Sequence, residues 1–328
     1  MKPKTKVIII IATICMALGL ACTATSFALA GFDVKNLSTS APSVEKSYFA
    51  KSHDFTEVHF EGLSENVFVK STSEENFSVK YHENDYLSFK ITEDKDTLHI
   101  VELYKPKVMV FSFNLEFDRA TTINVPESFT GTLNITSANG IVHVENFSNL
   151  ENITASSING GLEIANLIDI DSVKLESASD RINVATISAN RISASNMSGD
   201  ITLENLKVAE ELNVETISGA INFSDIVTAH AYFSTGSEII GGSSISCDSI
   251  VTNSTSGDIM IDLVEAAQIT ANNTSGSISY SIIGKNGDYY FTTSSMSGNI
   301  NVPQGANGAP KTADLSTVSG DIYFGFIA

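Results

Sequence analysis

The chain has 328 residues, of which 42% are hydrophobic, and its 38 acidic against 19 basic side chains give a net charge of −19. This length allows a large core and roughly two domains. From residue 131 onward, 21 acidic residues stand against six basic ones, a net charge of −15. Such a surface excludes nucleic acid as a partner, because nucleic-acid recognition needs a basic footprint. It also disfavours adhesion to bare anionic lipid and is typical of a soluble, self-repelling exported protein.

The first 31 residues predict export from the cytoplasm, as a signal peptide or as a membrane anchor. Lys2, Lys4 and Lys6 precede an uncharged, largely apolar stretch over residues 7–32. Basic residues followed by an apolar run are typical of an export signal. The lysines place the N-terminal end in the cytoplasm, so the chain after residue 32 is expected outside.

The fate of this segment stays open between three possibilities. Residues 28–30 (Ala-Leu-Ala) have the small-x-small form of a signal peptidase site, which would release a mature chain near Gly31. The same stretch is long enough to span a bilayer, and if uncleaved it would make the membrane a partner. Lipidation at Cys22 is the third possibility, although Gly19 stands where such a site usually carries a larger aliphatic residue.

Residues 32–45 are a polar connector, and residues 46–130 predict about six short strands. Apolar and polar residues alternate along pieces such as 77–81 and 87–91, and charged clusters such as 93–96 separate them. Alternation with a period of two places the apolar side chains on one face of a strand. We expect this N-terminal β-strand region to cap one end of the structure that follows.

A repeat of about 20 residues fills the rest of the chain, residues 131–328. The tetrapeptide Ser-Gly-Asp-Ile occurs at residues 198–201, 256–259 and 319–322. The apolar residue after each turn recurs every 19 to 22 residues, at Ile141, Leu162, Ile182, Ile201, Ile221, Ile240, Ile259, Ile278, Ile300 and Ile322. A constant period of this length indicates stacked units, none of which can bury its apolar face alone.

Each unit contains several short apolar alternations, and this pattern predicts an all-β fold, a β-solenoid of about ten turns. In a β-solenoid the chain winds once per unit, and equivalent residues stack about 4.8 Å apart. A β-sandwich with coincidental turn spacing is the alternative. The chain ends in an apolar run, residues 324–328, without a charged cap. We therefore expect a partner or the chain's own last turn to cover this end.

Glycines are expected to shape the turns between units, because glycine tolerates the positive φ angles that tight turns use. The six turn glycines are Gly199, Gly219, Gly257, Gly276, Gly298 and Gly320. Asp180 and Glu238 replace glycine in two further units. We expect these two turns to bulge.

Acidic residues beside the turns are the best candidate for a metal site. Asp200, Asp258 and Asp321 would share one edge of the solenoid, and a ladder of oxygen ligands can hold Ca²⁺. Turn chemistry is the competing interpretation, because Gly-Asp is also what a tight turn favours. His53 and His59 could share one strand face, but no third ligand accompanies them at a spacing typical of a metal site.

The residues suggest neither an enzyme nor a bound cofactor. The sequence contains no Gly-x-Ser-x-Gly elbow and no phosphate-binding glycine loop. Cys247 is the one cysteine after the export segment, which excludes an intramolecular disulfide there. A carbohydrate-cleaving β-helix is the enzymatic alternative, since paired carboxylates hydrolyse glycosidic bonds. The repeat region, however, has few of the aromatic and basic residues typical of such grooves.

The order of these features resembles a bacterial family of adhesin-like proteins that carry an N-terminal membrane segment and Ser-Gly-Asp-Ile repeats. The matching residues are the three Ser-Gly-Asp-Ile copies, residues 31–33, residues 123–127 and residues 133–141. The resemblance implies a β-helix-like fold and a location in the cell envelope, and it brings no catalytic residues.

Residues and resemblance together predict a non-enzymatic scaffold, at the cell surface or secreted, that presents a rigid surface to an unknown ligand. The alternative is an envelope-associated structural or sensory partner of another membrane protein. Deletion of residues 1–31 separates the two: adhesion by the freed rod would persist, and a role that depends on a membrane neighbour would be lost.

Overall fold

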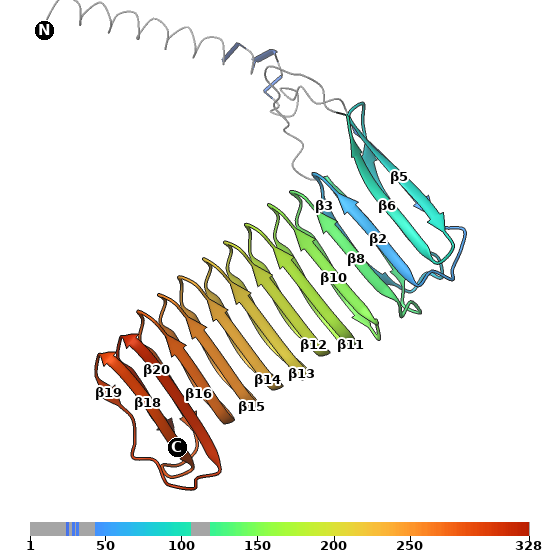
Figure 1. The fold of residues 1–328 in the computed structure, drawn as a ribbon. Helices are drawn as coiled ribbons and strands as arrows, with labels where there is room; N and C mark the ends of the chain where they lie inside the picture. Colours follow the sequence, from blue (N-terminus) through green and yellow to red (C-terminus); the bar gives the residue numbers. More distant parts are fainter. Residues whose placement is uncertain (1–23, 26–27, 30, 33–42, 106–118, 328) are drawn as a thin grey trace, which may run out of the picture.

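A computed structural model describes residues 24–25, 28–29, 31–32, 43–105 and 119–327. Most of these residues form a rod in which strands lie side by side across the long axis (Figure 1). The 21 strands of the described residues all belong to one sheet, which winds around the rod. The predicted all-β β-solenoid is confirmed, and the β-sandwich alternative is wrong.

Six long strands form the middle of the rod, and each pairs in parallel with the next. The first apolar residue of one unit is in register with that of the next, so that Ile182 pairs with Ile201 and Ile201 with Ile221. The sequence period is therefore one turn of the solenoid. The six strands are β11 (Leu162–Ser177), β12 (Ile182–Asn196), β13 (Ile201–Thr216), β14 (Ile221–Thr235), β15 (Ile240–Ser254) and β16 (Ile259–Asn273).

Alternate side chains of each turn point into the rod and form its core. In β13, the residues Ile201, Leu203, Leu206, Leu212 and Val214 are fully buried. Their equivalents in neighbouring turns stack on them in one continuous apolar column. Apolar burial contributes about 25 cal/mol for each Å² removed from water, so this column is the main source of stability.

Each long strand bends at a residue in the left-handed region of backbone space, and β11 has a second such residue, Asp169. Asn and Asp tolerate this conformation, whereas Thr and Leu are strained there. The bend lies four residues after the first apolar position of the turn, and its side chains begin a new face of the rod. The bend residues have φ between 54° and 59° and are Asn166, Thr186, Asn205, Asp225, Ser244 and Leu263.

At the N-terminal end, strands that come early in the sequence lie between later ones. β2 lies between β6 and β8, and β3 lies between β7 and β9, all in parallel. The antiparallel strands β1, β4 and β5 form the outer edge and cap this end. The strands concerned are β1 (Val44–Phe49), β2 (Glu57–Gly62), β3 (Asn66–Thr72), β4 (Ser78–Glu83), β5 (Leu87–Asp94), β6 (Thr97–Tyr104), β7 (Ala120–Pro126), β8 (Thr132–Ser137), β9 (Val142–Ser148) and β10 (Asn152–Ser157).

The C-terminal end is built in the same way, because the last two strands are inserted into the stack. β20 lies between β16 and β18, and β21 lies between β17 and β19. Ile322 therefore stacks between Ile278 and Ile300, and the expected order of the last turns is wrong. Phe324 is buried, so the chain itself covers this strand. The strands are β17 (Ile278–Ile283), β18 (Tyr289–Ser297), β19 (Ile300–Asn301), β20 (Lys311–Ser319) and β21 (Ile322–Ile327).

Most of the export segment expected over residues 1–31, including Cys22, lies outside the described residues. In the described part of the chain, no helix is both long enough and apolar enough to cross a membrane.

Candidate functional site

The turns between units form one long edge of the solenoid, and the six predicted glycines lie in it. None of the six has a positive φ, so the conformational reason expected for them is wrong. A Cβ on Gly219 would instead overlap the carbonyl oxygen of Gly199 in the neighbouring turn. At these six positions glycine allows the backbones of stacked turns to touch. The turns at Asp180 and Glu238 were expected to bulge, but Ile182 and Ile240, which follow them, keep the common register.

A buried polar side chain three residues before the glycine completes these turns, and the sequence analysis missed it. The Gly219 N–H donates to Thr216 Oγ1 at 3.0 Å, and the same hydroxyl donates to Gly199 O at 3.4 Å. One side chain thus links two turns. The sequence feature that could have revealed this side chain is the repeated spacing Ser/Thr/Asn-x-x-Gly, because the side chains of Ser, Thr and Asn often form hydrogen bonds with nearby backbone groups. The buried members are Ser137, Ser157, Asn196, Thr216, Ser254, Asn273 and Thr317.

The predicted acidic ladder lies on this edge, and each aspartate bonds the backbone of the next turn. Asp200 Oδ1 accepts from Ala220 N–H at 2.9 Å, and Asp258 Oδ1 accepts from Ser277 N–H at 2.7 Å. Asp321 accepts from Asn299 in the same way. With turns about 4.8 Å apart, aspartates two or three turns apart are too distant to share one ion. In the part of the chain that is described, no group of three or more His, Cys, Asp or Glu side chains could hold a metal ion.

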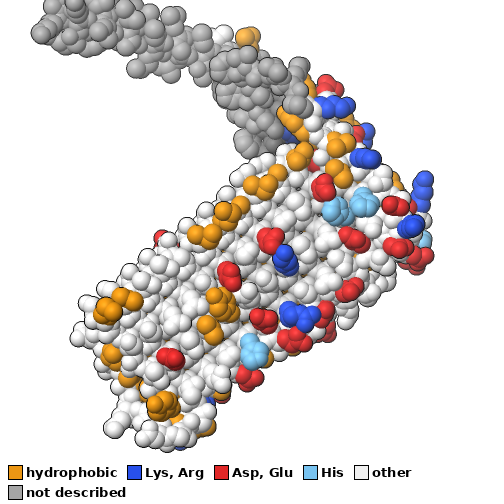
Figure 2. Space-filling model, viewed as in Figure 1, with side chains coloured by type: hydrophobic (Ala, Val, Ile, Leu, Met, Phe, Trp, Pro, Cys, Tyr) orange, Lys and Arg blue, Asp and Glu red, His pale blue; other side chains and the backbone are white. Residues whose placement is uncertain are grey.

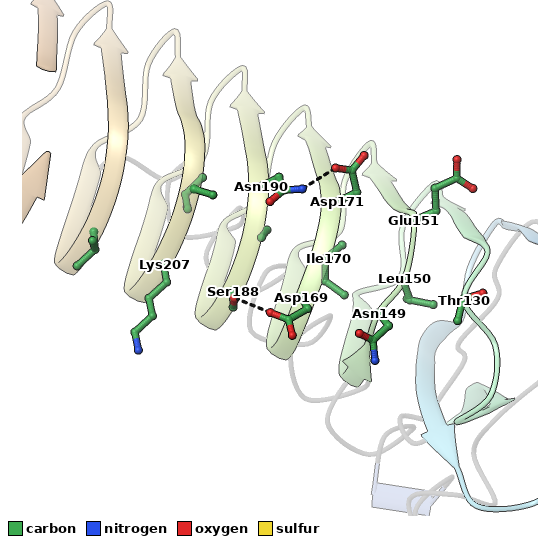
Figure 3. A pocket seen from close by; sticks show the side chains of 14 residues that line it. Thr130, Asn149, Leu150, Glu151, Asp169, Ile170, Asp171, Ser188, Asn190 and Lys207 are labelled. Carbon is green, nitrogen blue, oxygen red and sulfur yellow. Dashed lines mark hydrogen bonds between the residues drawn. The ribbon is translucent and has the colours of Figure 1, made fainter. Parts of the chain in front are cut away.

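A groove of about 680 Å³ crosses successive turns just after their bends (Figure 3). Its floor is apolar and comes from Leu150, Ile170, Ala189 and Val208, one residue per turn. Ala189 has the smallest side chain of these four residues. Polar side chains form the two rims, with Asn149, Asp169, Ser188 and Lys207 along one and Glu151, Asp171 and Asn190 along the other.

Contacts between turns orient the carboxylates of the rims. Asn190 Nδ2 donates to Asp171 Oδ1 at 2.8 Å, and Ser188 Oγ donates to Asp169 Oδ1 at 3.3 Å. Arg191 lies beside the groove, with its guanidinium 2.6 Å from Glu210 Oε2 and 3.4 Å from Asp171 Oδ2. A carboxylate can accept about four hydrogen bonds, so these oxygens can also accept bonds from a ligand.

A second hollow of about 310 Å³ continues the groove toward the C-terminal end. The two hollows share Lys207 and Val227. Asp225 and Glu265 add carboxylates to the lining, and Leu263 adds an exposed apolar side chain. The recessed surface therefore follows the long axis of the rod over most of the central turns.

Comparison with protein-family models matches the family described as Toastrack DUF4097, over residues 55–208 and again over residues 168–324. Together the two matches span most of the chain. The chain belongs to the Toastrack family. The overlap of the matches at residues 168–208 agrees with a fold made of similar turns. No curated protein matches the sequence.

Solved structures with some similarity to this Toastrack chain include three from Parabacteroides. A putative adhesin from Parabacteroides distasonis ATCC 8503 shares 10% identity, with 86% of this chain and 97% of that chain covered and a TM-score of 0.45. A putative adhesin from Parabacteroides merdae ATCC 43184 shares 11% identity, with 87% and 96% covered and a TM-score of 0.42. A putative lipid binding protein from P. distasonis ATCC 8503 shares 15% identity, with 85% and 96% covered and a TM-score of 0.35.

Two further predictions concern histidine and cysteine in this Toastrack chain. His53 precedes β2 and belongs to no strand, so it does not share a strand face with His59, although the spacing of the two residues would allow it. His59 instead lies beside His99 of β6.

Cys247 is a free thiol packed against the core. Burial, with a smaller contribution from Asp248, raises its pKa to about 12, which keeps the thiol protonated and unreactive.

Proposed function

We propose that this Toastrack protein is a non-enzymatic recognition scaffold outside the cytoplasm, either anchored at the cell surface or secreted. The observation that carries the proposal is the long groove, whose polar rims and apolar floor repeat in register from turn to turn. A polymer that extends along the rod meets a similar surface at every turn. Repeat proteins use extended surfaces of this kind for binding.

The groove chemistry favours a polysaccharide with hydroxyl or amino groups. Carboxylates at Glu151, Asp169 and Asp171 and amides at Asn149 and Asn190 supply hydrogen-bond acceptors along the rims. The apolar floor suits the C–H faces of sugar rings. An acidic chain with a net charge of −19 repels anionic polymers, so sulfated and uronic-acid glycans are expected to bind poorly.

A glycan panel tests this function. The full-length protein, purified in detergent, is incubated with neutral, amino-bearing and sulfated polysaccharides, and both retention and chain length are measured. Retention of a neutral or amino-bearing polymer without shortening is the expected result. Shortening of any polymer would favour a carbohydrate-cleaving enzyme instead. Retention of the sulfated polymers alone would contradict the proposed chemistry of the groove.

A second function is favoured by a different surface, the edge formed by the turns. Exposed apolar side chains gather along this edge (Figure 2), and they include Ile158, Met197 and Ile217. Such a row suits contact with another protein of the envelope. Crosslinking in the native cell tests this role: a neighbour captured from this edge, and lost in Ile217→Ser, would support it, whereas an identical crosslinking pattern in that variant would contradict it.

Location outside the cytoplasm follows from the order of lysines and apolar residues in the first 32 positions. Mass spectrometry of the N-terminus after cell fractionation distinguishes the possible fates. A start near Gly31 in the medium means secretion, and an intact N-terminal segment in the membrane fraction means anchoring. An intact chain in the cytoplasm would contradict the proposed location.

A further inference from the structure

The C-terminal end of the rod consists of two strands that each have a neighbouring strand on one side (Figure 1). Among the strands of the described residues, β18 pairs only with β20, and β19 pairs only with β21. A strand at the edge of a sheet presents unpaired backbone N–H and C=O groups, which another strand can bind. This edge is therefore a candidate interaction surface.

The apolar core is also uncovered at this end. Ile300 occupies the first apolar position of the last turn, and its side chain is 43% exposed, whereas Ile322 and Ile278 below it in the same column are fully buried. Phe291 is only partly buried, although Ala313, its partner on β20, is buried. Removal of apolar surface from water is favourable, so a partner that covers this end would be held by it.

Charge distinguishes this end from the N-terminal end of the rod. None of residues 289–310, which form β18, β19 and the loop that follows them, is charged. The edge strands β1 and β5 at the N-terminal end carry five charged residues, Glu45, Lys46, Lys90, Glu93 and Asp94. Charged side chains of this kind oppose pairing between edges. Copies of a chain with a net charge of −19 repel each other in general, but the C-terminal end adds nothing to that repulsion.

Successive residues of β18 direct their backbone groups to opposite sides of the strand, as in any strand. Asp288 O accepts from Lys311 N–H at 3.2 Å, so the backbone of Asp288 faces β20. Tyr289 O accepts from Ala306 N–H of the following loop at 3.1 Å, so the backbone of Tyr289 faces the open side. Every second residue from Tyr289 to Ser295 therefore directs its backbone N–H and C=O to the open side.

The loop covers only the start of this open side. A Cβ on Gly305 would lie 3.2 Å from Phe291 N, so the loop passes close to the backbone of Phe291. Thr293 and Ser295 come next along the strand and, among the described residues, have no neighbouring strand on this side. Their backbone groups are placed symmetrically about Ser294.

We propose that two copies of this chain join through their C-terminal ends, with β18 of one copy antiparallel to β18 of the other. A two-fold axis at Ser294 pairs Thr293 of each copy with Ser295 of the other, and each pair exchanges two backbone hydrogen bonds. The occupant is a second copy because this symmetry satisfies the same free groups on both sides. The sheet continues from one copy into the other, and the interface uses none of the residues that line the groove.

Disulfide crosslinking at the proposed axis tests the geometry. The full-length protein in detergent, with Cys15→Ser and Cys22→Ser to remove the thiols of the N-terminal segment, carries either Ser294→Cys or Ser316→Cys. Ser316 is the matched control, because it pairs with Ser294 and lies one strand farther from the open edge. Directly opposed residues of an antiparallel pair that do not bond each other have Cα atoms about 4.5 Å apart, within the range of a disulfide. Mild oxidation is expected to link most of the Ser294→Cys protein into dimers and to leave the Ser316→Cys protein unlinked.

Two crosslinking results would overturn the proposal. One is equal crosslinking of the two variants, which would mean collision or association through another part of the chain. The other is no crosslinking of a Ser294→Cys protein whose circular dichroism shows a folded β structure.

Hydrogen exchange of the full-length wild type gives a second measurement that needs no substitution. Exchange at Thr293 and Ser295 is expected to slow as the protein concentration rises, because their N–H groups become bonded, whereas exchange over β5 stays constant. Rates at Thr293 and Ser295 that do not depend on concentration would contradict the proposal. Slowing over β5 as well would mean that copies stack head to tail, which also contradicts it.

Discussion

Thr216 and Gly219 are joined by a hydrogen bond of 3.0 Å from the glycine N–H to the threonine hydroxyl. The same hydroxyl reaches the carbonyl oxygen of Gly199 in the preceding turn, and a Cβ on Gly219 would overlap that oxygen. The small residue lets two turns approach, and the hydroxyl satisfies the backbone groups that the approach buries. This pair, repeated along the rod, explains the turn motif of the sequence.

Replacement of Gly219 by alanine is expected to destabilise the rod by about 1–3 kcal/mol or more, because backbone on the neighbouring turn must move. The midpoint of urea unfolding measures the effect. Gly241→Ala is the matched control: a Cβ there would lie 3.4 Å from Asn222 Oδ1, an ordinary contact. Equal midpoints for the two variants would contradict the requirement for a close approach at Gly219.

Thr216→Val keeps the shape of the side chain and removes its hydroxyl. The Gly219 N–H then lacks the partner that it has in the wild type, and an unsatisfied buried donor costs about 1–3 kcal/mol. Thermal unfolding measures the loss. Thr202→Val, on a half-buried position of the same strand, serves as control and is expected to change the midpoint little. A similar shift in both variants would mean that the turn hydroxyl has no special role.

Leu263→Asn is expected to stabilise the protein, because Leu263 occupies a left-handed bend with φ of 55° that asparagine tolerates. The reverse change at the equivalent bend, Asn205→Leu, is expected to destabilise it. The gain and the loss should each be about 1 kcal/mol. Urea midpoints of both variants provide the measurement. A loss of stability in Leu263→Asn would show that side-chain packing outweighs backbone strain at this position.

The solenoid could be predicted because an apolar residue recurs in the sequence once per turn, from Leu162 to Ile278. Equivalent positions in stacked turns have the same environment, so the same kinds of residue recur at these positions. The order of the last turns could not be predicted this way. Ile300 and Ile322 fit the period equally well in either order, and the spacing alone does not show that β20 and β21 pair with β16 and β17.

The groove and the proximity of His59 to His99 could not be predicted from the sequence either. The floor of the groove includes Ile170, Ala189 and Val208, which become neighbours only when the turns stack. His59 and His99 are far apart in the chain and meet through the parallel pairing of β2 and β6. The turn glycines were found for their spacing, although the physical reason is contact between turns rather than a positive φ.

The buried thiol of Cys247 predicts a specific dependence on pH. Its pKa is raised by burial to about 12, whereas an unfolded cysteine ionises near 8.5. The folded chain therefore holds a proton that the unfolded chain loses, so this contribution to stability is complete below about pH 8.5 and is lost as the pH rises toward 12. Unfolding midpoints between pH 8 and 11 should fall less steeply in Cys247→Ala. An identical slope in both proteins would contradict the assignment.

Binding through the groove is tested most directly by a pair of charge-matched variants, measured with the polysaccharide that the wild type retains. Asp169→Asn with Asp171→Asn removes two rim carboxylates, and Glu204→Gln with Glu215→Gln removes two exposed carboxylates that do not line the groove. The affinity of the groove variant is predicted to fall by about tenfold, since a hydrogen bond to a charged group contributes about 1.5–3 kcal/mol, while the control variant binds like the wild type. Equal affinities in the two variants would contradict recognition through the groove.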